Sequence, residues 1–186
     1  MSIKLITPPA VEVFSLAEAK VALRKETDEE DALIAMLISA ARKQAEHITG
    51  RAFGAQTREL IIDAFPDDEI LLPGSPVTSI TSVIYADETG ATQTLDSAAY
   101  VLDPDYVPSS LLPAAGLSWP GTYATANAVR VRYDCGHVAA DVPDVKVWMQ
   151  ITVCTLFAQR EGLSGNAISA VPRQAWDAYL DPYIIY

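Results

Sequence analysis

Residues 15–51 read SLAEAKVALRKETDEEDALIAMLISAARKQAEHITGR, and their apolar residues recur at the spacing of amphipathic helices. Ser15 is followed three residues later by Glu18. This pair is the signature of a capping box, in which each side chain satisfies a free backbone N–H at the start of a helix. The pattern predicts a first helix over about residues 16–25.

A second and longer helix is predicted over about residues 29–49. Thr27 and Glu30 repeat the capping-box spacing before it, and Gly50 can end it as a left-handed cap. The stripe that we expect to face the core consists of Leu33, Ile34, Leu37, Ile38, Ala40, Ala41, Gln44, Ala45 and Ile48.

Four consecutive acidic residues, Asp28, Glu29, Glu30 and Asp31, stand at the predicted start of the second helix. They could form a metal site. Negative charge also stabilises the positive end of a helix dipole, and adjacent residues on a helix point to different sides. We therefore favour a solvated, dipole-stabilised helix start over a metal site.

The middle of the chain changes to a period of two, which is typical of strands. Asp87 to Gly90 is predicted to be a hairpin loop, and the clear alternation over residues 128–135 places Arg130 and Arg132 on one strand face. These arginines, with Arg58 near them, could hold an acidic partner, although an ordinary exposed strand face is the simpler interpretation. The predicted strands are residues 56–64, 70–72, 77–86, 91–95, 100–102 and 128–135.

The two ends of the chain differ in pattern. Residues 1–14 contain Pro8 and Pro9, which favour an extended arm that is loose in a monomer or packs on a neighbour in a ring. After residue 142 the chain returns to helices, predicted over residues 143–160 and 172–180 around a flexible loop at 162–170. An apolar tail, Tyr183 to Tyr186, follows the last helix.

Composition limits the classes of function. The chain has 13 Lys and Arg against 24 Asp and Glu, a net charge of −11, which disfavours wrapping of nucleic acid. Acidic residues lining a channel would instead repel the DNA phosphates and let DNA slide past. An acidic surface is also a common means of keeping a protein soluble. There is no apolar run long enough to span a membrane and no signal peptide, so we expect a protein made in the cytosol.

Candidate catalytic residues are few. Cys135 and His137 could form a nucleophile pair, but no third residue that would orient them is evident. Carboxylate pairs such as Asp103 and Asp105 lie beside proline or glycine, where aspartate commonly forms turns, and the glycine and glutamate of a calcium loop are missing. We therefore predict no catalytic residue, no metal and no cofactor.

These patterns together predict an α+β fold with a helical core of about four helices and a β-rich insertion between the second and third long helices. We expect one domain over residues 1–186, helical over 15–50 and 142–181, with the insertion over 56–135.

The sequence resembles the head–tail connector (adaptor) proteins of tailed bacteriophages over nearly its whole length. Each motif alone is common, and their order carries the resemblance. The motifs are LAEAK (residues 16–20), DEED (28–31), TGR (49–51), LP (72–73), PVTSI (76–80), the hairpin with Asp87 and Gly90, WP (119–120), VRVRY (129–133), DVP (141–143) and the segment 172–183.

The resemblance implies a structural virion protein at the head–tail junction, made in the bacterial host cytoplasm and without enzymatic activity. It would form a dodecameric ring under the portal in the particle, with a monomer as the alternative state in solution. The ring would extend the DNA channel without sequence-specific contacts and would dock neck and tail-completion proteins. The C-terminal segment would reach the portal. The residues that we expect at this contact are Pro172, Trp176, Tyr179, Leu180, Tyr183, Ile184, Ile185 and Tyr186.

Two other functions stay open at the level of sequence. A small acidic hydrolase would use a carboxylate pair or the Cys135 and His137 pair. A host-protein-binding module would present acidity to a basic partner, and its binding would be sensitive to salt. The acidic residues are spread along the chain, which ranks the binding module last.

Overall fold

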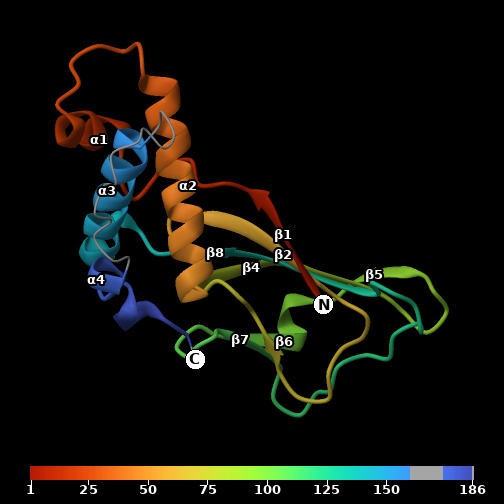
Figure 1. The fold of residues 1–186 in the computed structure, drawn as a ribbon. Helices are drawn as coiled ribbons and strands as arrows, with labels where there is room; N and C mark the ends of the chain where they lie inside the picture. The colour runs from red at the N-terminus through yellow and green to blue at the C-terminus, as the bar shows by residue number, and fades with distance from the viewer. Residues whose placement is uncertain (160–173, 186) are drawn as a thin grey trace. The chain divides into compact units, whose positions relative to one another are not determined.

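The computed structural model describes residues 1–159 and 174–185, and the chain divides into two compact units. The sheet unit comprises Met1–Ala10 and Ala55–His137, and the helical unit comprises Val11–Gly54 and Val138–Tyr186. The ribbon in Figure 1 can be followed through both units by its colour. Because each unit contains two separate segments, the chain passes from one unit to the other three times.

The described residues of the helical unit include three helices of eight residues or more, with shorter turns over residues 174–183. α2 and α3 pack against each other and α1 contacts both. In the described residues its elements are α1 (Leu16–Leu23), α2 (Asp31–Thr49), the 3-10 turn η2 (Ala139–Asp141), α3 (Pro143–Ala158), α4 (Gln174–Asp177) and the 3-10 turn η3 (Asp181–Tyr183).

The start of α1 agrees with the sequence and the start of α2 does not. Ser15 and Glu18 form the predicted capping box: the Glu18 backbone N–H donates to Ser15 Oγ at 3.3 Å, and the Ser15 N–H donates to Glu18 Oε2 at 3.0 Å. The box predicted at Thr27 is wrong, because α2 begins only at Asp31 and its cap residue, Glu30, makes no capping side-chain bond.

The core of the helical unit lies between α2 and α3. The buried stripe of α2 contains Ile34, Ile38, Ala41 and Ala45, whose spacing of four, three and four follows the helical period. Leu33, Leu37 and Ile48 pack at its margin and are only partly buried. The residues of other elements that join this core are Val13, Phe14, Ala19, Phe53, Val142, Val145, Trp148, Met149, Val153, Phe157 and Leu180.

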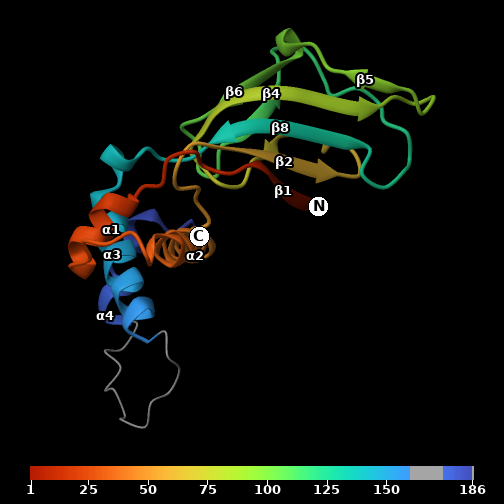
Figure 2. The same ribbon diagram turned by 90° about the horizontal axis from the view of Figure 1, so that it is seen from above.

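The sheet unit contains a five-stranded antiparallel sheet in the order β1-β2-β8-β4-β5 and a three-stranded antiparallel sheet in the order β3-β7-β6. Figure 2 shows β1, β2, β8 and β4 lying side by side. The strands are β1 (Ser2–Thr7), β2 (Gln56–Ile62), β3 (Ile70–Leu71), β4 (Val77–Ala86), β5 (Thr92–Thr94), β6 (Tyr100–Asp103), β7 (Ser110–Pro113) and β8 (Val129–Cys135).

The centre of the sheet unit is β8, which pairs with β2 on one side and β4 on the other. Its burial alternates as predicted, with Val129, Val131 and Tyr133 buried and Arg130 exposed. The Tyr133 hydroxyl donates to the Pro73 carbonyl at 2.7 Å, and burial raises the pKa of this phenol. Tyr133 thus stays neutral and links the large sheet to the segment that follows β3.

The predicted fold class is wrong in its proportions. The described residues contain eight strands in two antiparallel sheets and three helices of eight residues or more, so the protein is richer in strands than a four-helix core with an insertion. Two strands account for the difference. β1 lies ahead of the helices, yet it pairs with β2, and β7 lies in a segment whose prolines masked its pattern. None of the helices in the described residues has the length and apolar content that a membrane crossing needs.

Candidate assembly surfaces

The C-terminal segment, residues 174–185, folds back onto its own helical unit. Leu180 is 0% exposed and belongs to the core, while Trp176 and Tyr183 are partly buried against that core. Tyr179 is 42% exposed. Ile184 and Ile185 are also partly buried, and the predicted contact residues Pro172 and Tyr186 lie outside the described residues. The segment predicted to contact the portal therefore also completes the fold.

Polar contacts fix this segment to residues that are distant in sequence. The indole Nε1 of Trp148 donates to Asp177 Oδ1 at 2.9 Å. Arg51 Nε donates to the Tyr183 carbonyl at 2.7 Å, and the Ile185 N–H donates to the Thr49 carbonyl at 3.0 Å. The end of α2 and the middle of α3 thus hold the segment in place.

The Tyr183 ring lies edge-on to Phe53, with ring centroids 6.1 Å apart and planes at 81°. This is a favourable arrangement for an aromatic pair. Burial raises the pKa of the Tyr183 hydroxyl, and Asp144 adds to the shift while Arg51 opposes it. Of the predicted contact residues in the described part of the chain, Tyr179 is accordingly the one left most available to a partner.

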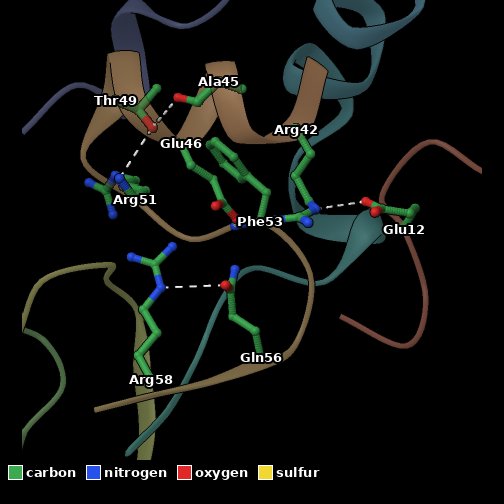
Figure 3. Close-up of polar contacts among 9 residues, drawn as sticks. All are labelled: Glu12, Arg42, Ala45, Glu46, Thr49, Arg51, Phe53, Gln56 and Arg58. Atoms are coloured by element: carbon green, nitrogen blue, oxygen red, sulfur yellow. Dashed lines mark hydrogen bonds and ion pairs between the residues drawn. The ribbon is translucent and has the colours of Figure 1, made fainter. Parts of the chain in front are cut away.

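A buried arginine, Arg42, organises polar contacts around the second half of α2. Arg42 is 2% exposed; its Nε lies 2.9 Å from Glu12 Oε2 and its Nη1 lies 3.0 Å from Glu46 Oε1. Glu46 Oε1 also accepts the Phe53 backbone N–H at 3.0 Å. Figure 3 shows these side chains together with Thr49, whose hydroxyl donates to Ala45 and accepts from the Arg51 N–H. The cluster joins the segments before α1 and after α2, which indicates a structural role.

The acidic residues at the start of α2 make ion pairs with lysines. Lys20 Nζ lies 2.5 Å from Asp28 and 2.8 Å from Asp31, and Lys25 Nζ lies 2.6 Å from Glu30. Within residues 1–159 and 174–185, no group of three His, Cys, Asp or Glu side chains is placed to hold a metal ion. These contacts favour the structural interpretation of the acidic cluster.

The cysteines do not resemble nucleophiles. Cys135 is 2% exposed and pairs in the sheet with Gln56 and Val77. Burial raises the pKa of the Cys154 thiol, which disfavours the reactive thiolate. A catalytic thiol needs an accessible, stabilised thiolate, so the burial of Cys135 disfavours the nucleophile pair with His137 that the sequence left possible.

The arginines of the large sheet lie on different faces. Arg132 Nη2 is 2.8 Å from Glu59 Oε1, directly across the strand pair. Arg58 is opposite Tyr133, which places it on the other face, where its Nε donates to Gln56 Oε1 at 3.4 Å. The three arginines therefore do not form the single surface that the sequence suggested.

The edge strand β1 is the second candidate surface, and sequence analysis gave it only as an extended arm. All six of its residues are exposed, including Ile3, Leu5 and Ile6 at 40–45%. β2 pairs with one of its sides, and in the sheet order β1 is terminal. The sequence SIKLIT carried a signal for this strand, namely β-branched and apolar residues ahead of the Pro8–Pro9 break.

The fold has counterparts in solved structures of phage-like particles. A chain from the neck of an empty gene transfer agent (GTA) particle, computed with C6 symmetry, gives a TM-score of 0.80 at 22% identity, covering 100% of this chain and 96% of that one. A chain from the virion of a native GTA particle gives 0.80 at 20% identity with the same coverage. A chain from the neck of a native GTA particle, computed with C12 symmetry, gives 0.75 at 20% identity, again with that coverage.

This chain shares its fold with neck proteins of GTA particles. No protein-family model and no curated protein matches the sequence. The likeness to these neck chains spans the whole chain, and it confirms the resemblance to head–tail connector proteins at the level of the fold. Identities of 20–22% establish nothing finer than the fold.

Proposed function

We propose that this protein is a structural component of the neck of a tailed phage or phage-like particle, where it forms a ring under the portal and extends the DNA channel. The observation that carries the proposal is the full-length match in fold, which covers 100% of this chain and 96% of a GTA neck chain.

Ring assembly is supported by the symmetry of the related particles. The GTA necks were computed with C6 and with C12 symmetry. A cyclic ring needs two different surfaces on each subunit that fit one another. The net charge of −11 is consistent with a channel wall that repels DNA phosphates.

The proposal includes a role for the C-terminal segment in docking on the portal. Tyr179 is the natural anchor, because it is exposed, aromatic and held beside a buried Leu180. Removing the last fifteen residues is a poor test, because it also removes Leu180 from the core and exposes the helical unit to unfolding. A point substitution separates docking from folding.

The test is imaging of the purified protein mixed with portal rings from the same particle. We expect an added ring of density with the portal's symmetry. Tyr179→Ala should weaken docking roughly 10-fold, as for an aromatic interface anchor. Val21→Ala is the matched control, because Val21 is an apolar residue 80% exposed on α1. Portal rings without added density, beside a monodisperse monomer, would overturn the proposal.

A further inference from the structure

β1 offers an edge for addition of a strand. Ser2 to Leu5 pair residue by residue with Ile61 to Arg58, and the register shifts only between Leu5 and Thr7. The opposite edge of the same sheet is less suited to pairing. There β5 is three residues long and polar, and the register of β4 is interrupted twice by irregularities. Short strands and bulges are common means of blocking an edge, and β1 has neither over Ser2 to Leu5.

The two faces of this edge carry different chemistry. On one face Lys4 lies opposite Glu59, and Glu59 lies opposite Arg132, so the charges run positive, negative, positive from β8 outward. On the other face Ile3 lies opposite Leu60, which lies opposite Val131. Cross-strand neighbours of opposite charge and of apolar character both stabilise a sheet. An added strand that continued both rows would place a carboxylate beside Lys4 and apolar residues beside Ile3 and Leu5.

A second copy of this sheet does not supply that strand. Antiparallel pairing of two β1 strands that brings Ile3 beside Leu5 of the other copy also brings the two Lys4 side chains together, and like charges directly opposite are destabilising. Pairing with β5 of a neighbouring copy in a ring is opposed by twist. Four strand junctions turn the strand direction by roughly 80–100° from β1 to β5, so neighbouring edges would cross instead of aligning.

We propose that β1 binds an extended segment of another protein chain, added as a sixth strand, in which one acidic residue stands between two apolar residues. This is recognition by strand addition, in which backbone hydrogen bonds supply affinity and alternate side chains supply specificity. The inference rests on the proposed function in one respect, namely that the added segment belongs to a neighbouring neck component.

The test uses the full chain and a peptide, acetyl-Thr-Thr-Val-Glu-Val-Thr-Thr-amide. Its matched control replaces the central Glu with Lys. NMR titration to millimolar concentration should shift the backbone amide signals of Ser2 to Thr7 and slow hydrogen exchange at those amides of the strand that point away from β2. We expect the acidic peptide to bind roughly 2- to 5-fold more tightly than the lysine peptide. General attraction to a protein of net charge −11 predicts the opposite order, so the comparison is decisive.

A charge exchange completes the test. Lys4→Glu should reverse the preference between the two peptides, while Lys43→Glu, on α2 of the other unit, should leave it unchanged. Amide shifts elsewhere, no shifts in β1, or an unchanged preference in Lys4→Glu would each overturn the inference. Concentration-dependent dimers that Lys4→Glu does not alter would also count against it. The peptide test involves no portal, so it can succeed or fail whether or not the protein forms a ring on the portal. Likewise, the portal experiment can succeed or fail whether or not the peptide binds.

Discussion

The two ends of the described chain are both rich in apolar residues, yet they are used in opposite ways. The C-terminal segment contributes Leu180 to a core and is tied down by Trp148, Arg51 and Thr49. The N-terminal strand β1 is hydrogen-bonded along one side and leaves its side chains exposed. Apolar composition alone does not separate a segment that completes a fold from one that offers a surface. Burial and backbone pairing do.

Truncating Leu180 should give the largest loss of stability. Leu180→Ala removes a fully buried side chain, and we expect it to lower the free energy of unfolding by about 2–5 kcal/mol. Leu5→Ala, at a 45% exposed position of β1, should cost less than about 1 kcal/mol. Urea unfolding followed by circular dichroism measures both. Equal losses would erase the contrast between the two ends.

Loss of the Arg42 cation should have the next largest effect. Arg42→Met leaves Glu12 and Glu46 without their buried partner, and we expect a cost of about 3 kcal/mol at neutral pH. Lys43→Met, next in sequence but exposed, is the control. Equal losses of stability in Arg42→Met and Lys43→Met would show that the ion pairs of Arg42 contribute no more than an exposed cation does.

The indole hydrogen bond tests how firmly the C-terminal segment is held. Trp148→Phe removes the donor to Asp177 while keeping an aromatic ring, and should cost about 1.5–3 kcal/mol, as for a bond to a charged acceptor. Hydrogen exchange at the Leu180 and Tyr183 amides should quicken, because both donate within this segment. Unchanged exchange there would mean that apolar packing alone holds the segment. The coupling energy follows from a double-mutant cycle of Trp148→Phe and Asp177→Ala, since alanine leaves no acceptor for the indole N–H.

A surface charge pair should matter least. Glu18 accepts a hydrogen bond from Lys146, which, with bonds from Ser15, lowers the pKa of the carboxyl to about 2. A lowered pKa stabilises the fold above about pH 4.5, and this contribution is lost as the pH falls towards 2. Both side chains are more than a third exposed, so the contribution should be below about 1 kcal/mol. Glu18→Gln should flatten this part of the pH–stability curve, and a curve identical to wild type would exclude the pair as its source.

Sequence patterns predicted the local elements well. The strand over residues 77–86 and the Ser15 capping box were found as predicted, and α2 ends at Thr49 as expected. The sequence signal for each of these features lies in neighbouring residues. Two strands were missed for different reasons: β1 pairs with a strand about fifty residues later, and the pattern of β7 was masked by prolines in its segment.

The candidate surfaces were predicted only in part. The C-terminal segment was correctly singled out as apolar and aromatic, but its packing could not be inferred because its partners Trp148, Arg51 and Thr49 are far away in sequence. The charge row through Lys4, Glu59 and Arg132 needed the strand register, which no local pattern supplies. That the predicted contact residues dock on the portal stays a prediction. That residues 1–186 form a single domain also stays a prediction.

The chain passes between its two units three times, and this affects what happens to the subunit when a protease cuts it. The passages follow Ala10, Gly54 and His137. A protease that cut one of them would leave two covalent tethers, so a nicked subunit would not shed either half. The same chain path constrains folding during synthesis. β1 leaves the ribosome well before β2, so it cannot pair with β2 until α1 and α2, which lie between them in sequence, have been made. Because neither unit is one continuous segment of the chain, a single cut or a simple truncation does not separate them.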